Sequence, residues 1–263
     1  MTDSELIRRR HRLMGGATLF YDSPLHIVRG EGVYLYDHEG RQYVDMYNNV
    51  PCVGHANPHV VAAIEKQMST LNVHSRYLHG GILDFAERLL SYHHAGLEQV
   101  VFACSGTEAS EIALLMARHG TGGQGIVCSD ATYHGNSTEV DKMSAQPVTD
   151  PNFRSIPFPQ TYRPLAEGLD STDLARLYLG KLQEAIDDFA ENNIPFAGLF
   201  FCSIFANEGL PDIPQGFMAQ AVELVHKAGG VVIADEVQAG YCRSGNWWGY
   251  ETSQFTPDIV TMG

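Results

Sequence analysis

Short, almost continuously apolar runs recur through the second part of the chain and predict buried strands. They lie at 100–104, 126–128, 198–204, 231–234 and 259–262. Segments with helical spacing separate them, at 107–118, 171–191 and 217–228. Strands that are apolar on both faces and alternate with helices are typical of parallel sheets. We therefore predict an α/β fold with a mostly parallel central sheet and helices on both faces.

The first part of the chain has a different pattern. Alternating aromatic and β-branched residues on either side of a glycine turn predict a hairpin over 33–45. Helical spacing predicts a short basic helix over 1–14 and two amphipathic helices, over 58–68 and 82–90. The polar, proline-marked stretch 144–164 is expected to be loop.

Composition and charge narrow the classes of function. The 263 residues are 44% hydrophobic and 18% charged, which favours a chain with a substantial core over a disordered one. The net charge of −14 repels phosphate backbones and anionic lipid, so we expect no nucleic-acid partner and no membrane partner. A small anionic ligand is still allowed, because a local pocket can carry the opposite potential.

The cysteines and the N-terminus indicate the compartment. The five cysteines are odd in number and no two are spaced as C-x-x-C, so we expect buried thiols in a reducing environment. The basic segment 8–12 is not followed by the apolar stretch of a secretory signal. We therefore predict a cytoplasmic protein.

Two tempting motifs do not have the context that they need. Residues 120–125 match G-x-G-x-x-G, but a helix precedes them and a strand follows, which is the reverse of the dinucleotide-binding order. We interpret them as a helix-to-strand turn. His55 and His59 are separated by Pro58, which breaks the helix that would bring them to one face, so no metal site is predicted.

A strand-to-helix turn at 105–108 is the first candidate for chemistry. Ser105 and Glu108 fit a helix-capping box, and capping alone would explain them. A helix N-terminus at the carboxyl end of a parallel strand also offers free N–H groups. Gly106 would let the backbone approach a ligand and Thr107 would add a hydroxyl, which together would make a phosphate site. Both interpretations stay open at this point.

Further candidates follow two predicted strands. Asp235 ends the apolar run 231–234, at the edge where open α/β sheets bind ligands. It is either a cap for the next element or a carboxylate aimed at a cationic ring nitrogen, with Val237 as an apolar floor and Glu236 on the other side of the strand. Tyr133 is either a loop aromatic that covers the end of the sheet or a ring-stacking platform.

Together these residues resemble the class III aminotransferases, which are fold-type I pyridoxal-phosphate enzymes. The matching motifs, in order, are 30–37, 54–58, 105–109, 133–135, 235–245 and 257–263. Segments at 19–30, 49–55 and 71–79 are similar to the branch that includes the ethanolamine-phosphate phospho-lyases. The resemblance implies that residues 1–60 contribute to a smaller α+β domain. It implies that residues 61–263 form a cofactor-binding large domain, incomplete at its C-terminus.

The resemblance also implies pyridoxal 5'-phosphate as the cofactor. Its contacts would come from Ser105, Gly106, Thr107, Tyr133, His134, Glu208, Asp235, Val237 and Gln238. The helix N-terminus would bind the phosphate, while Tyr133 and Val237 would pack on the two faces of the ring. Asp235, the catalytic residue, would pair with the ring nitrogen and keep it protonated. Gln238 would lie near the phenolic oxygen and Glu208 near the cofactor.

The family's Schiff-base lysine is not among these residues. The four lysines are Lys66, Lys142, Lys181 and Lys227, and none matches the family's position. That position comes directly after the motif ending at Gly263, so we expect the lysine immediately after Gly263. A buried amine beside a cationic cofactor would have a depressed pKa and would serve as nucleophile and base.

The resemblance predicts a transaminase that moves an amino group between an amine or amino acid and a keto acid or aldehyde. It would act as a homodimer with shared active sites, in which Tyr21, Val50, Arg76 and Tyr77 would meet the substrate. The alternative is a phospho-lyase, which expels phosphate from an amino-alcohol phosphate by β-elimination. Arg76 would then hold the substrate phosphate, although an ordinary surface arginine is an equal interpretation. A cofactor-binding or regulatory domain without catalysis is the third alternative.

Overall fold

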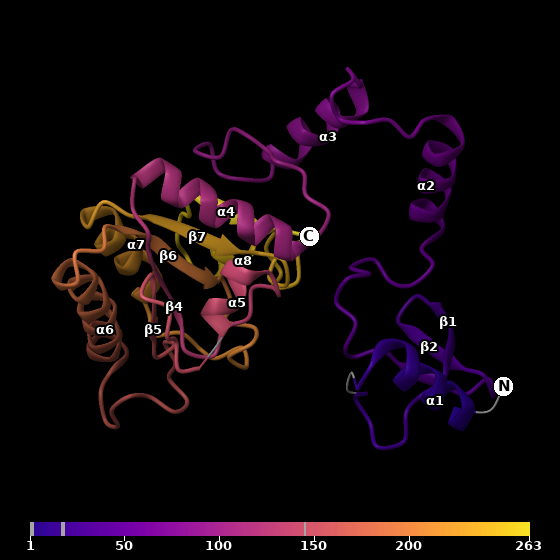
Figure 1. The fold of residues 1–263 in the computed structure, drawn as a ribbon, viewed down its shortest axis with the longest axis horizontal. Coiled ribbons are helices and arrows are strands. Elements are labelled where there is room, and N and C mark those ends of the chain that lie inside the picture. The colour runs from indigo at the N-terminus through magenta and orange to yellow at the C-terminus, as the bar shows by residue number, and fades with distance from the viewer. Residues whose placement is uncertain (1–2, 17–18, 145) are drawn as a thin grey trace. The chain divides into compact units, whose positions relative to one another are not determined.

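The computed structural model describes residues 3–16, 19–144 and 146–263, and the chain divides into two compact units (Figure 1). The first is Met1–Leu78 and the second is His79–Gly263. The assignment of residues 1–60 and 61–263 to a small and a large domain stays a prediction.

The first unit combines two helices with a small antiparallel sheet. Its elements are α1 (Asp3–Met14), β1 (Ile27–Glu31), β2 (Tyr34–Asp37), β3 (Gln42–Val44) and α2 (Pro58–Thr70). The predicted basic helix, hairpin and amphipathic helix are confirmed, whereas β1, which pairs with β2, was not predicted. α2 begins after Asn57, whose side chain accepts hydrogen bonds from the N–H groups of His59 and Val60.

The second unit is built around five parallel strands in the order β5-β4-β6-β7-β8. Its elements are α3 (Gly80–Leu90), α4 (Gly106–Thr121), β4 (Gly125–Ser129), α5 (Thr138–Ser144), β5 (Phe153–Ile156), α6 (Ser171–Glu191), β6 (Phe196–Cys202), α7 (Phe217–Lys227), β7 (Val231–Asp235), α8 (Gly249–Thr252) and β8 (Ile259–Thr261). The predicted α/β fold with a parallel sheet is confirmed.

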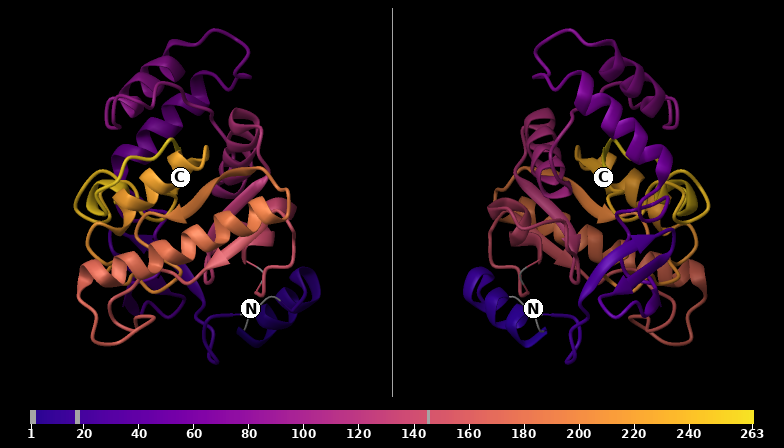
Figure 2. Two further views of the ribbon diagram at one scale, coloured as in Figure 1. Left: turned by 90° about the vertical axis from the view of Figure 1, so that its left-hand side faces the viewer. Right: turned by 90° about the vertical axis from the view of Figure 1, so that its right-hand side faces the viewer.

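Helices cover both faces of this sheet, which is why the strands are apolar throughout. On one face Val127, Leu199 and Val232 pack in one cluster with side chains from α6 and α7. On the other face Phe200 and Ile233 pack with side chains from α4 and α5. Figure 2, left, shows α6 running across the strands. Successive strand residues point to opposite faces, so each face needs its own apolar set.

Two predictions of local structure are wrong. Residues 100–104 form no strand: Val101 and Phe102 are 62% and 49% exposed, and no ladder supports them. An apolar run becomes a strand only where a neighbour takes up its backbone hydrogen bonds. In contrast, the expected loop 144–164 contains β5, whose ends Phe153 and Ile156 are buried. Adjacent prolines hid this short edge strand, which pairs with β4.

The cysteines divide into two groups. Cys128 and Cys202 are buried, but Cys52, Cys104 and Cys242 are exposed, so the prediction of buried thiols is wrong for these three. They lie outside the strands that form the core. Within the described part of the chain, no helix is both long and apolar enough to cross a membrane.

Candidate active site

The carboxyl ends of the parallel strands meet at one edge of the sheet. From β4 the chain moves outward to β5 and then returns to the other side of β4 as β6, so the winding direction reverses between β4 and β6. Open α/β sheets bind ligands at such a reversal. Asp235 ends β7, and the segments after β4, β6 and β7 carry Tyr133, His134, Glu208, Val237 and Gln238; all six are predicted to bind the cofactor.

Asp235 makes hydrogen bonds with several residues at this edge of the sheet. Its side chain is 8% exposed, and its Oδ2 lies 2.6 Å from Nδ1 of His134. Oδ1 accepts hydrogen bonds from the N–H of Val237 at 2.9 Å and from the hydroxyl of Thr261 at 3.3 Å. One oxygen therefore caps the turn that follows β7, while the other belongs to a buried polar chain. The capping interpretation is confirmed for Oδ1, and the pairing of the carboxylate with a ring nitrogen stays a prediction.

His134 extends that chain to Thr132. His134 is 4% exposed, and its ring stacks on Phe200 with the ring centroids 4.2 Å apart. Its Nε2 lies 2.6 Å from Oγ1 of Thr132. With Nδ1 toward Asp235 and Nε2 toward Thr132, the buried ring joins the two residues in one polar chain. Thr132 and Thr261 were missed by sequence reasoning, although both adjoin motifs that it used.

The N-terminus of α4 lies beside the same loops. Ser105 is its N-cap, and Oγ of Ser105 accepts from the N–H of Glu108 at 3.2 Å. Glu108 reaches back to the N–H of Cys104 at 2.6 Å, one residue before the cap of a standard capping box. Gly106 and Thr107 then carry N–H groups that the helix does not use, at the positive end of its dipole.

Glycines bring the loops against this helix end. A Cβ at Gly106 would lie 2.9 Å from Cγ1 of Val237, so only glycine fits there without a shift. Gly135 has φ +134°, and a Cβ on it would lie 2.5 Å from Oγ1 of Thr107. The predicted phosphate turn, the Tyr133 loop and the Asp235 turn are thus packed together. The other glycine motif, 120–125, is confirmed as a helix-to-strand turn, because Gly122 ends α4 in the left-handed conformation.

Glu208 contributes a buried carboxyl after β6. Its Oε1 accepts from the hydroxyl of Ser129, whereas its Oε2 is buried without a hydrogen-bond partner among the described residues. Burial raises the pKa of Glu208. An unsatisfied buried oxygen costs free energy unless a ligand meets it, so Glu208 marks a place for a bound group.

Glu236, next to Asp235, has a structural role. It is fully buried and accepts from the N–H groups of Gly249 and Tyr250 at 2.7 and 2.9 Å. Burial raises the pKa of Glu236 as well. Its carboxylate fixes the start of α8, while that of Asp235 faces the sheet edge.

The remaining predicted residues fall into two groups. Tyr133 is 48% exposed, and its carbonyl accepts from the side-chain amide of Asn207. Stacking of its ring on the cofactor stays a prediction. Gln238 is half-buried, and its carbonyl accepts from Arg243. The substrate candidates lie in Met1–Leu78, the other compact unit, and their role stays a prediction. They are Tyr21, Val50, Arg76 and Tyr77.

These groups fit pyridoxal phosphate. The end of α4 offers unused N–H groups and a hydroxyl to a phosphate, and Asp235 offers a fixed carboxylate to a ring nitrogen. Gly106 lets Val237 pack against the start of α4, and Oε2 of Glu208 has no hydrogen-bond partner among the described residues.

The family model of the class-III aminotransferases matches residues 20–263. The mitochondrial alanine–glyoxylate aminotransferase 2 homolog 2 of Arabidopsis thaliana is 36% identical over 99% of this chain and 55% of its own length. The ethanolamine-phosphate phospho-lyase homolog 1 of Caenorhabditis elegans is 31% identical over 98% of this chain and 60% of its own length. The chain thus spans little more than half of these relatives.

Solved structures agree with the sequence comparison. A phospholyase from Arthrobacter in complex with phosphoethanolamine superposes with a TM-score of 0.92 and 38% identity, over 98% of this chain and 62% of that one. A taurine:2-oxoglutarate aminotransferase from Bifidobacterium kashiwanohense, at 24% identity and a TM-score of 0.85, shares the fold. By the match over residues 20–263, the chain belongs to the class III aminotransferases, a pyridoxal-phosphate-dependent family of fold type I.

Proposed function

We propose that the protein carrying this chain is a pyridoxal-phosphate-dependent transaminase, which moves an amino group between an amine or amino acid and a keto acid or aldehyde. The observation that carries the proposal is the buried chain from Thr132 through His134 to Asp235, beside the N-terminus of α4. Pyridoxal phosphate, when bound, supplies an electron-poor ring that stabilises negative charge on the carbon next to the substrate nitrogen.

Asp235 would hold a proton on the ring nitrogen. The Asp235 side chain is only 8% exposed, so its carboxylate is weakly screened and would favour the protonated nitrogen more strongly than a surface carboxylate would. His134 donates to Oδ2 and fixes the direction of the carboxylate, and Thr132 fixes His134 in turn. Thr132 and His134 are positioning residues in this proposal.

The surrounding residues would bind and orient the cofactor. The N–H groups of Gly106 and Thr107 would bind the phosphate with the hydroxyl of Thr107. Tyr133 and Val237 would pack on opposite faces of the ring. Glu208, whose pKa is raised by burial, would meet a polar group with its unpartnered Oε2, and Gln238 would lie near the phenolic oxygen.

The second candidate is a phospho-lyase acting on an amino-alcohol phosphate. It is favoured by the likeness to the Arthrobacter phospholyase that is solved with phosphoethanolamine. Both reactions begin with the same loss of a proton next to the substrate nitrogen, so the sheet edge serves either. The substrate end decides between them, and Arg76 is the proposed phosphate ligand. A homodimer and a cytoplasmic location are further parts of the proposal.

The test uses the full-length protein with pyridoxal phosphate. With an amino donor such as alanine and a keto acid such as glyoxylate, we expect amino transfer that requires both partners. Phosphoethanolamine should then release no inorganic phosphate. Phosphate release without any keto acid would instead establish the phospho-lyase. A protein that takes up no pyridoxal phosphate would overturn both and leave a binding or regulatory domain.

A further inference from the structure

Two histidines lie opposite each other at one end of the β1–β2 pair in Met1–Leu78. His26 precedes β1 and His38 follows β2. The N–H of His38 donates to the carbonyl of His26 at 3.1 Å, which continues the register of Ile27 opposite Asp37. Residues directly opposite on an antiparallel ladder project from the same face with their Cβ atoms about 5 Å apart. The backbone therefore places the two imidazoles side by side.

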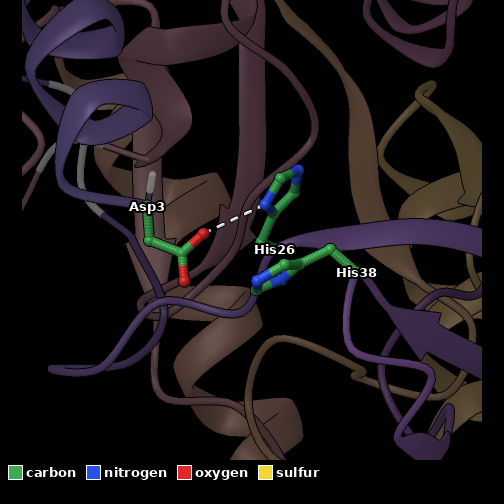
Figure 3. A group of neighbouring side chains, drawn as sticks. All are labelled: Asp3, His26 and His38. Atoms are coloured by element: carbon green, nitrogen blue, oxygen red, sulfur yellow. Dashed lines mark hydrogen bonds and ion pairs between the residues drawn. The ribbon is translucent and has the colours of Figure 1, made fainter. Parts of the chain in front are cut away.

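A carboxylate from the first helix completes the group. Oδ1 of Asp3 lies 3.0 Å from Nδ1 of His26, and the rings of His26 and His38 stack with their centroids 4.7 Å apart. Figure 3 shows a nitrogen of each ring on the side that faces the Asp3 carboxylate. One ligand atom from each of the three residues lies within 4.8 Å of the other two.

We propose that Asp3, His26 and His38 bind a divalent transition-metal ion of the Zn²⁺ class. Ligand atoms around a tetrahedral zinc ion lie about 3.4 Å apart, so small side-chain rotations would close the observed group around an ion. Two imidazole nitrogens and one carboxylate oxygen suit zinc, copper or nickel better than calcium or magnesium. Three protein ligands leave the fourth position to water.

The three side chains are accessible to an ion from solvent, and a bound ion would link two elements of this unit. Asp3 and His38 are exposed and His26 is partly exposed, so an ion reaches the group from solvent without opening the fold. A bound ion would tie the first turn of α1 to the sheet. The sequence predicted no metal site because the three residues match no ligand spacing; strand register and the position of α1 bring them together.

An ion pair between Asp3 and His26 alone would need no third residue, so His38 discriminates between the two explanations. The experiment titrates the full-length protein, with any histidine tag removed, with Zn²⁺ by calorimetry. Co²⁺ absorption spectra then report the coordination. We expect a saturable site for one Zn²⁺ per chain. His38→Gln and His26→Gln should each weaken binding by at least about tenfold, and Asp3→Asn should weaken it too.

The matched control is His59→Gln, which changes an exposed histidine of the same unit and should leave the affinity unchanged. Far-UV circular dichroism confirms that each variant is folded. Amino transfer by His38→Gln should equal that of the wild type, which separates this proposal from the proposed function. Absence of Zn²⁺ binding, or binding that His38→Gln leaves intact, would overturn the proposed site.

Discussion

The two compact units differ sharply in how they bury their apolar side chains. His79–Gly263 encloses complete strands and large side chains such as Phe200 and Trp248, both 0% exposed. In Met1–Leu78, Asp37 is the only buried residue among those the structure describes, and Met46 and Val50 are 89% and 86% exposed. His79–Gly263 therefore has a core and, at one edge of its parallel sheet, a set of fixed polar side chains. Met1–Leu78 presents an apolar surface, which agrees with the proposed homodimer and its shared sites.

The largest expected effect is on turnover and concerns Asp235, at the carboxyl edge of the parallel sheet. Asp235→Asn should leave the fold intact and lower turnover of the full-length protein on the order of 10³-fold, because a neutral amide no longer favours a protonated ring nitrogen. Steady-state kinetics and circular dichroism check this. Near-normal rates in the first half-reaction would show that Asp235 is not the partner of the ring.

The next prediction compares the cost in unfolding free energy of a leucine-to-alanine substitution in each of the two units. Leu182→Ala removes a side chain that is 0% exposed and should cost about 2–5 kcal/mol of unfolding free energy. Leu78→Ala changes a side chain that is 101% exposed and should cost less than about 0.5 kcal/mol. Urea denaturation measures both. An equal cost at Leu78 would mean that this residue is covered in the assembled protein and would break the contrast.

Packing at the end of α4 should give a smaller effect. Gly106→Ala would press a methyl group against Val237 and should cost about 1–3 kcal/mol, with weaker uptake of pyridoxal phosphate. Gly120→Ala is the control in the same helix, where a Cβ meets nothing within 4 Å and alanine is the better helix former. Thermal unfolding and cofactor titration check both variants. Equal uptake by the two variants would contradict the close approach assigned to Gly106.

The smallest effect is a change in pH dependence at Glu208. Burial raises its pKa above the ordinary 4.5, so the folded chain binds more protons there than the unfolded chain. Stability is therefore lost as the pH rises from the ordinary value through the raised one. Glu208→Gln removes that loss, so its stability relative to wild type should increase with pH, by at most about 1.4 kcal/mol per pH unit.

Urea denaturation between about pH 4 and pH 8 checks the expected slope at Glu208. Glu223→Gln, which changes an exposed carboxylate on α7, is the control and should follow the wild type. A curve for Glu208→Gln that runs parallel to that of the wild type would show that folding leaves this carboxyl unperturbed.

The sequence predicted what local periodicity controls. α6 spans Ser171–Glu191, as its helical spacing predicts, and the structure adds Asp170 as its N-cap. The strand ending at Asp235 was also predicted, because its apolar run ends on a carboxylate. Residues 100–104 and β5 show the limit: both are short, and whether a short segment pairs depends on neighbours that sequence spacing does not reveal.

In the candidate site, too, some residues were predicted from local sequence patterns and others were not. Asp235 and Gly106 were predicted as site residues because they stand at strand and helix ends that the sequence marks. The partners of His134 and Asp235 were missed: Thr132 meets His134 within a loop, and Thr261 meets Asp235 across the register of β7 and β8. The contact of Thr261 depends on tertiary pairing, whereas that of Thr132 spans two residues of a loop whose conformation no regular sequence period predicts.

The most direct test of the proposed site is the protonation of the cofactor ring. Pyridoxal phosphate labelled with ¹⁵N in the ring is bound to the full-length protein and to its Asp235→Asn variant, and the ¹⁵N chemical shift is measured at neutral pH. We expect a protonated ring nitrogen in the wild type and an unprotonated one in the variant. A protonated nitrogen in both proteins, or an unprotonated one in the wild type, would contradict the role of Asp235.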